Sequence, residues 1–256
     1  MKSFSEREGL MLAGLFLSKF DREGLLRLGF ANFSEAYNAM GYALGGKPAS
    51  IKNYMQEFDP FFPNSRQGWH KRPMRDHCRQ AYERFGQLTL PEFYRLLSPL
   101  LLSSVMPLPD GMDELAALDE DYFENESFSK RLITGAAAEG FFESSFPKLA
   151  NFTGHILTNV TRFGCGFDFR LQPVDSRPFL AVEVKGMAEA NGEILMTRKE
   201  YQVANYLRER YFLCVVRNFV ESPVLTLFQN PLERGLQFTS RERQLTTVTW
   251  HARIPA

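Results

Sequence analysis

Residues 164–170 read GCGFDFR and residues 179–186 read FLAVEVKG, and these two segments decide the fold. Both are short apolar runs, and a segment with two prolines joins them, so they predict two strands and a turn. Side chains two apart in a strand point to the same face, so Glu183 and Lys185 share one face, and Asp168 from the neighbouring strand can reach them. Charged groups in apolar strands need partners, because an unpaired buried charge is costly.

The three charged residues form a pattern that suits a divalent metal ion. Mg²⁺ takes oxygen ligands, usually one or two protein carboxylates, and leaves its other positions to water and phosphate. Asp168 and Glu183 are therefore candidate metal ligands. Lys185 is placed to orient or deprotonate an attacking water, or to stabilise charge on a phosphate. The alternative is a strand-edge salt bridge of Glu183 with Lys185 or Arg170, which needs no metal.

A helix expected over residues 127–150 offers a further carboxylate. Glu139 and Glu143 lie four residues apart and so share one helical face. We favour Glu139 as the one that reaches the Asp168 site, because it follows small residues that allow close packing. The alternative is that both glutamates lie in solvent.

The segments after the central pair predict a mixed sheet with helices on it, an α/β arrangement. The expected elements are a strand at 192–196, a helix at 198–210, and strands at 211–217 and 224–228. Thr197 and Glu200 have the spacing of a capping box at the start of that helix, and we assign Glu200 to this role.

The first hundred residues predict helices. Helices are expected at 5–29, at 35–44 with Ser34 as cap, at 49–58, and over 82–102. The two middle helices flank a glycine turn, which is the form of a helix-turn-helix unit. Ser50, Lys52 and Asn53 begin its second helix and suit phosphate and base contacts. An ordinary αα-hairpin with a solvated face is the alternative.

Residues 66–79 form the most basic stretch of the chain. Basic side chains interleaved with an indole suit a nucleic-acid backbone. The candidate nucleic-acid-binding residues in this stretch are Arg66, Trp69, Lys71, Arg72 and Arg75. A solvated basic face is the alternative interpretation.

Composition bounds the class of protein. The formal net charge of the 256-residue chain is zero, but residues 106–126 are acidic and lack Lys and Arg, whereas the flanking parts are mildly basic. This leaves room for a polyanionic partner. The three cysteines are far apart and form no Cys/His cluster, which argues against structural zinc and disulfides. No apolar run is long enough to span a bilayer, so we expect a cytoplasmic protein without a membrane partner.

Residues 135–217 resemble the Mrr-like nuclease domains of the PD-(D/E)xK superfamily, the type found at the C-terminus of the NO VEIN protein and in many restriction enzymes. The matching text is Glu139 with the small residues before it, residues 164–168, 182–186 and 197–200, and the strand after Tyr211. Phe167 stands where the superfamily name calls for proline, a departure that is frequent in this fold. The text at 50–60 and 68–73 is similar to a module that accompanies such domains.

The resemblance implies Mg²⁺-dependent hydrolysis of DNA phosphodiester bonds. By position, Asp168 and Glu183 would bind metal, Lys185 would assist the attacking water, and Glu139 would be the helix acid. The expected architecture is α/β. It consists of a mainly α-helical DNA-recognition domain at 1–105, an acidic linker at 106–126, and a restriction-endonuclease-like domain at 127–256, with a mixed sheet flanked by helices.

The leading hypothesis is a sequence-specific restriction or anti-phage endonuclease that cuts double-stranded DNA as a homodimer, because one active site cuts one strand. A second hypothesis is a DNA-binding regulator or targeting subunit that keeps the nuclease fold without cutting. A third is a nuclease directed at RNA, for which exposed stacking platforms would be expected.

Overall fold

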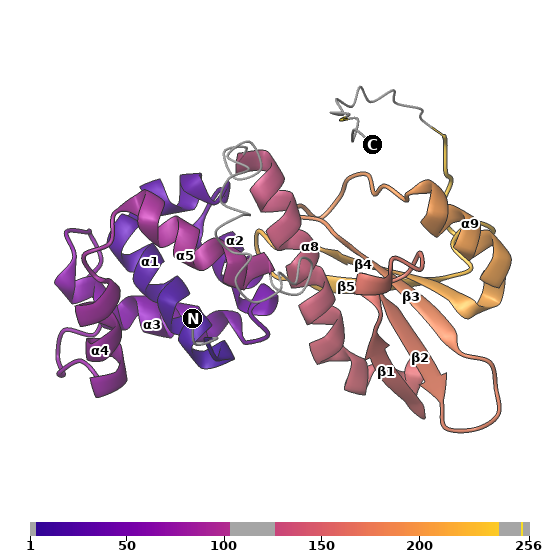
Figure 1. Cartoon of the computed structure of the whole chain (residues 1–256), viewed down its shortest axis with the longest axis horizontal. Coiled ribbons are helices and arrows are strands. Elements are labelled where there is room, and N and C mark those ends of the chain that lie inside the picture. Colours follow the sequence, from indigo (N-terminus) through magenta and orange to yellow (C-terminus); the bar gives the residue numbers. More distant parts are fainter. Residues whose placement is uncertain (1–3, 103–125, 241–251, 253–256) are drawn as a thin grey trace.

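The computed structural model describes residues 4–102, 126–240 and 252. Figure 1 shows a helical half at one end of the molecule and a sheet at the other, with helix α8 lying between them. The acidic segment expected as a linker at 106–126 lies outside the described residues, except for Glu126, which begins α8.

The helices expected at 5–29, 35–44 and 49–58 are present, but the one expected over 82–102 is two helices, the first of which begins at Asp76. The following elements make up the described part of the helical half. They are α1 (Glu6–Arg27), α2 (Phe33–Ala43), α3 (Pro48–Phe58), the 3₁₀ turn η1 (Asp59–Phe61), α4 (Asp76–Phe85) and α5 (Leu90–Leu102). The prediction of Ser34 as the cap of α2 is wrong, since Asn32 accepts the hydrogen bond from the backbone of Glu35. None of the described helices has the length and apolar character needed to cross a membrane.

The second half is a five-stranded mixed sheet, which confirms the predicted α/β class. Its elements are α8 (Glu126–Ser145), η2 (Phe146–Lys148), η3 (Ala150–Phe152), β1 (His155–Asn159), η4 (Thr161–Phe163), β2 (Phe169–Pro173), β3 (Leu180–Gly186), α9 (Arg198–Leu207), η5 (Arg208–Arg210), β4 (Tyr211–Arg217) and β5 (Val224–Gln229). The strand order is β1-β2-β3-β4-β5. Only the β3–β4 pair is parallel, and α9 connects these two strands.

Two strand assignments differ from the prediction. Residues 192–196 form no strand, and Leu195 in this segment is 72% exposed rather than packed in the sheet. Strand β1 was not predicted from the sequence. It lies at the edge of the sheet, and Ile156 in it is 59% exposed, so its apolar pattern is too weak to indicate a buried strand.

The two faces of the sheet are covered by different helices, as alternation along the strands requires. Val182 and Val184 of β3 belong to the core beneath α8. Ala181 of β3 and Tyr211 of β4 pack instead with Ala204 of α9. Glu183 and Lys185 therefore lie on the α9 face of the sheet.

Helix α8 joins the two halves through one continuous core that contains residues of both. Phe141 of α8 packs edge-on against Tyr42 of α2, with ring centroids 4.8 Å apart. Lys130 forms an ion pair of 2.7 Å with the buried Glu35 of α2. A Cβ atom added to Gly140 would lie 2.2 Å from the carbonyl oxygen of Tyr42, so glycine is what allows α2 and α8 to pack this closely.

This contact predicts that Gly140→Ala lowers the free energy of unfolding by about 1–3 kcal/mol, because the added methyl group meets rigid backbone. Gly135 of the same helix is the matched control, since a Cβ atom there meets nothing within 4 Å. Gly135→Ala should be neutral or stabilise the protein by about 0.5–1 kcal/mol through helix propensity. Urea unfolding followed by circular dichroism measures both. Equal effects of the two substitutions would contradict the close contact.

Candidate active site

Asp168 lies immediately before β2, where the strand meets β3. Its backbone N–H donates to the carbonyl of Val182 at 3.0 Å, and its carboxylate accepts the N–H of Val184 at 2.8 Å. The carboxylate thus replaces a backbone carbonyl as the acceptor of the next hydrogen bond from β3. This contact fixes the side chain of Asp168 relative to that strand. Gly166, two residues earlier, has a φ of 91° and lets α9 approach to within contact of Val203.

Lys185 is held between two carboxylates on the α9 face. Its Nζ lies 2.6 Å from Oε1 of Glu183 and 2.7 Å from Oε2 of Glu200. The salt bridge of Glu183 with Lys185, which was the alternative interpretation of the triplet, is therefore present. Glu200 also closes the capping box with Thr197 at the start of α9.

Glu200 is the residue of this cluster that the sequence placed only in a helix cap. Its capping role is confirmed, but the same carboxylate also contacts Lys185. The spacing of Glu200 from Lys185 along the chain does not predict their contact, because an irregular segment and the first turn of α9 separate them. The contact follows only from the way α9 packs on the sheet.

Glu139 reaches the cluster from α8 and is buried, with 7% of its surface exposed. The charge of Asp168 acts on its carboxylate and raises its pKa, whereas the polar side chains of Thr161 and Asn159 act to lower that pKa. One oxygen, Oε2, is buried and has no hydrogen-bond partner. Glu143, one turn further on, is exposed. The structure thus places Glu139 rather than Glu143 in the buried position that the sequence favoured.

Burial and mutual repulsion shift the acidity of this cluster. Burial, followed by the charge of Asp168, raises the pKa of Glu139 from 4.5 to about 8. Burial is also the main cause that raises the pKa of Asp168 and of Glu183. Burial alone would lower the pKa of Lys185, but the charges of Glu183 and Glu200 outweigh it and raise that pKa. The site therefore gathers more carboxyl groups than Lys185 alone can balance in their ionised form.

Such a site has the chemistry of a cation site. A divalent ion would relieve the same repulsion that raises these pKa values. Within residues 4–102, 126–240 and 252, no three or more His, Cys, Asp and Glu side chains gather into a group that could hold a metal ion. A Mg²⁺ site of one or two carboxylates, completed by water and phosphate oxygens, does not need such a group. Asp168 and Glu183 are two such carboxylates and fit this simpler form.

The raised pKa of Glu139 predicts a pH-dependent stability. Between about pH 4.5 and pH 8 the unfolded chain loses this proton while the folded protein keeps it, so the wild type loses stability as the pH rises through this window. Glu139→Gln removes the buried charge. We expect the variant to gain about 1–3 kcal/mol relative to the wild type between pH 5 and pH 8.5 without metal.

Chemical denaturation at a series of pH values measures this difference. Glu143→Gln is the matched control on the same helix, and because Glu143 is exposed we expect a smaller change of the same sign. A stability difference between Glu139→Gln and the wild type that stays constant over the whole pH range would contradict the burial of an ionisable Glu139.

The candidate nucleic-acid-binding residues of the helical half fall into two groups. Lys52, Asn53 and Lys71 are exposed, and Ser50 is half-buried at the start of α3. Within the described part of the chain, Lys52 and Lys71 form no ion pair, so their ammonium groups face solvent. These four side chains are accessible, and their role in binding stays a prediction.

Arg72 and Arg75 instead converge on one buried carboxylate. Oε2 of Glu57 lies 2.6 Å from Arg72 and 2.9 Å from Arg75. The two guanidinium groups also lie over the indole of Trp69, at 4.7 and 5.8 Å from its centroid. Burial alone would raise the pKa of Glu57, but hydrogen bonds from Arg75 and Arg72 outweigh it and lower that pKa. Much of the charge in this part of the basic stretch is thus neutralised internally.

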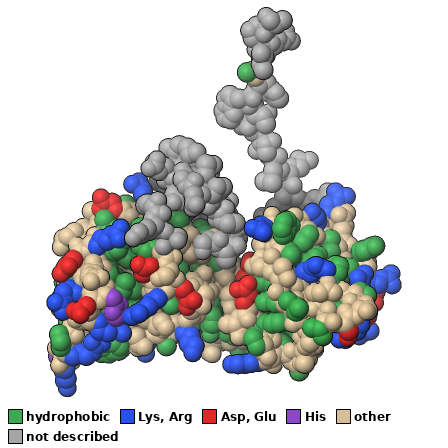
Figure 2. All heavy atoms as spheres, turned by 60° about the horizontal axis from the view of Figure 1, so that its bottom comes forward, with side chains coloured by type: hydrophobic (Ala, Val, Ile, Leu, Met, Phe, Trp, Pro, Cys, Tyr) green, Lys and Arg blue, Asp and Glu red, His purple; other side chains and the backbone are tan. Residues whose placement is uncertain are grey.

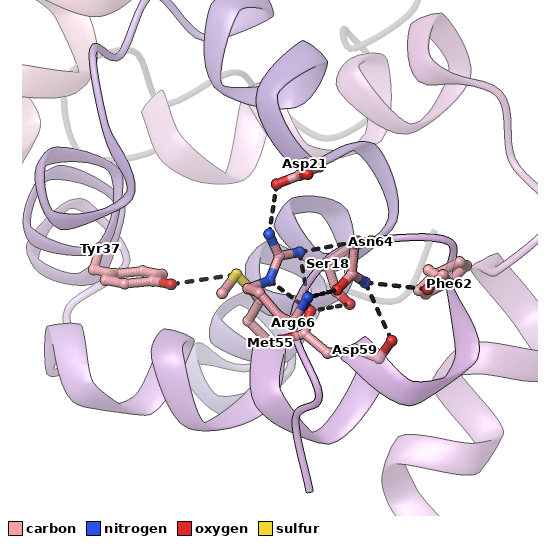
Figure 3. Close-up of polar contacts among 8 residues, drawn as sticks. All are labelled: Ser18, Asp21, Tyr37, Met55, Asp59, Phe62, Asn64 and Arg66. Carbon is pink, nitrogen blue, oxygen red and sulfur yellow. Dashed lines mark hydrogen bonds and ion pairs between the residues drawn. The ribbon is translucent and has the colours of Figure 1, made fainter. Parts of the chain in front are cut away.

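Arg66 is the most fully occupied of the predicted basic residues (Figure 3). Its guanidinium group pairs with the buried Asp59 at 3.0 Å and with Asp21, and it donates to the carbonyl of Ser18. Asp21 has a φ of 47° at a kink in α1. Asn64 holds the loop around Arg66 by donating to the carbonyls of Asp59 and Phe62. These contacts give Arg66 a structural role, because they join the loop to the kinked helix.

We expect Arg66→Met to lower the free energy of unfolding by about 3 kcal/mol, because Asp59 would be left buried without its cation. Lys71→Met in the same loop removes an exposed charge and should stay within about 0.5 kcal/mol of the wild type. Thermal unfolding of the two variants measures the difference. If Arg66→Met unfolds at the same temperature as the wild type, the Arg66 contacts do not stabilise the fold.

On the face drawn in Figure 2, the described residues show no dominant charge. Figure 2 shows acidic and basic side chains interspersed over this face of both halves, in keeping with the formal net charge of zero. Binding of a polyanion would therefore depend on local groups of basic residues rather than on the overall charge.

Residues 139–228 match a protein-family model described as "Protein NO VEIN, C-terminal". The matched region begins at Glu139 and contains Asp168, Glu183, Lys185 and Glu200, and it ends within β5. It covers about a third of the chain and includes none of the helical half. No curated protein and no solved structure matches the chain.

Proposed function

We propose that the protein is a Mg²⁺-dependent endonuclease that hydrolyses phosphodiester bonds in DNA. The observation that carries the proposal is the buried cluster in which Asp168, Glu183 and Lys185 meet, with Glu139 reaching in from α8. The match of this region to the NO VEIN C-terminal family, whose domains are nuclease-like, supports it. The finer assignment to the PD-(D/E)xK superfamily is part of the proposal.

In this proposal Asp168 and Glu183 would hold the metal ion, and Glu139 would reach it through a bridging water. A bound Mg²⁺ increases the acidity of its water and neutralises charge on a phosphate. The chain orients the two carboxylates by different means. The N–H of Val184 fixes that of Asp168, and Nζ of Lys185 contacts that of Glu183.

Lys185 would act as a cation rather than as a base. Glu183 and Glu200 together raise its pKa, so the side chain keeps its proton at neutral pH. An ammonium group in a largely buried site stabilises negative charge that develops on a phosphate far better than it would in water. Glu200 is then a positioning residue, since it holds Lys185 from the side away from Glu183.

The helical half would contribute DNA recognition. Lys52, Asn53 and Lys71 are accessible for this, and Ser50 lies beside them at the start of α3. One chain has one such cluster in the described residues, so cutting both strands of a duplex calls for two copies, and we propose a homodimer. We therefore propose a role in restriction or anti-phage defence, because such systems use sequence-specific cutting of DNA.

Cleavage of DNA tests this proposal. We expect the wild type to cut a mixed-sequence duplex library in Mg²⁺ into discrete fragments, and Asp168→Asn and Lys185→Met to lose at least about 100-fold in rate. Asp175→Asn is the matched control, because Asp175 is exposed on the β2–β3 turn and pairs only with Arg177 among the described residues. It should cut like the wild type.

The alternative functions give different results in the same assay. A non-cleaving DNA-binding protein would bind the duplex with and without Asp168→Asn and would cut nothing. A nuclease directed at RNA would cut RNA in preference to DNA when both are supplied. Equal rates for Asp168→Asn and the wild type would contradict the proposed site.

A further inference from the structure

We propose that Arg170 and Arg210, stacked against Phe179, form a phosphate-binding site on the sheet that holds the DNA strand beside the active site. This inference rests on the proposed nuclease function for the identity of the polyanion as DNA. None of the three residues was a predicted binding residue, and the helical half contributes nothing to the site.

The register of the sheet places this site on the same face as the catalytic cluster. Arg170 of β2 is the pairing partner of Ala181 of β3, and paired residues point to the same face. Ala181 and Glu183 are two residues apart, so they share that face at a spacing of about 7 Å along the strand. The backbone of Arg170 therefore lies level with Ala181, one strand repeat from Glu183, and its guanidinium group lies over Phe179, which is two strand repeats from Glu183.

Phe179 holds the two guanidinium groups together. Arg170 lies 5.2 Å and Arg210 5.8 Å from the centroid of its ring. The ring is itself steadied by Phe167, whose centroid is 6.0 Å away, and it packs on the small core beneath α9. Arg210 ends η5, just before β4, and Phe179 lies just before β3, so the site joins a residue of β2 to the segments that lead into β3 and β4.

The charge of these two arginines is not neutralised within the described part of the chain. Neither forms an ion pair there, and the polar contact of Arg170 is with the side-chain oxygen of Gln172. This sets them apart from Arg66 and Arg72, whose guanidinium groups are occupied by buried carboxylates. A planar guanidinium group stacked on a ring keeps its N–H edge free and pre-oriented for a phosphate.

A polyanionic strand fits this arrangement better than a single small anion does. The acidic cluster and the arginine pair lie on the same face of the sheet, on either side of the buried Ala181, so a chain with phosphates at regular intervals can place one near Glu183 and another at Arg170. The phosphate contacts would position the strand without reading its sequence, which is the usual division of roles between backbone and base contacts.

The salt dependence of DNA binding tests the site. The probe is a fluorescent duplex of mixed sequence, and the solution contains EDTA so that nothing is cut. We expect Arg170→Gln and Arg210→Gln each to weaken binding about tenfold and to reduce the slope of log K against log salt by about 0.9, and the double variant to lose about twice that slope. Arg177→Gln is the control, because Arg177 is exposed but paired with Asp175. Its slope should equal that of the wild type.

Other outcomes separate this inference from the proposed function. Cleavage by the wild type together with an unchanged slope in the double variant would overturn the phosphate site and leave the nuclease intact. Binding that needs both arginines, without any cleavage in Mg²⁺, would support the phosphate site and overturn the enzyme. A wild type that neither binds nor cuts DNA would overturn both. Phe179→Leu, which keeps the core apolar but removes the ring, should weaken binding less than either arginine variant.

Discussion

The close packing of α8 between the helical half and the sheet is the constraint on which the rest of the structure depends. Gly140 lets the helix meet the backbone of Tyr42 in α2, and the next residue towards the N-terminus is Glu139, which enters the acidic cluster. A helix pressed between two layers has little freedom to turn or slide, because protein interiors are closely packed. The position of Glu139 is thus set by contacts on both sides of α8, and any shift of α2 would be felt at the site.

The same packing explains why the cluster is poorly balanced in charge. Sheet and helix together bury Glu139 and Glu183 and leave Asp168 half-buried, and Lys185 is the cation that the chain supplies among them. A purely structural cluster would gain by losing one carboxylate, since a buried uncompensated charge is destabilising. Excess carboxylate held in place by a sheet hydrogen bond and by Lys185 is what a site for an external cation requires. This excess of carboxyl groups, together with the family match, supports the proposal of a metal-dependent nuclease.

Local patterns predicted much of this arrangement, whereas packing between distant elements could not be predicted. Alternation along β3 placed Glu183 and Lys185 on one face, and small residues before Glu139 indicated a buried carboxylate. The contact of Glu200 with Lys185 depends on how α9 lies on the sheet, which no local spacing encodes. Arg66 was predicted to bind nucleic acid, but its guanidinium group pairs with Asp59 instead. The local sequence does not show this pairing, because only the fold brings the two side chains together.

The most direct test of the central claim is calorimetric titration of Mg²⁺ into the DNA-free protein. The account predicts saturable binding to the wild type, its loss in Asp168→Asn and in Glu183→Gln, and unchanged binding in Glu233→Gln, whose exposed carboxylate only accepts from Asn230 among the described contacts. Binding that persists in Asp168→Asn, or no binding to the wild type, would contradict it and would leave the buried carboxylates without the role proposed for them.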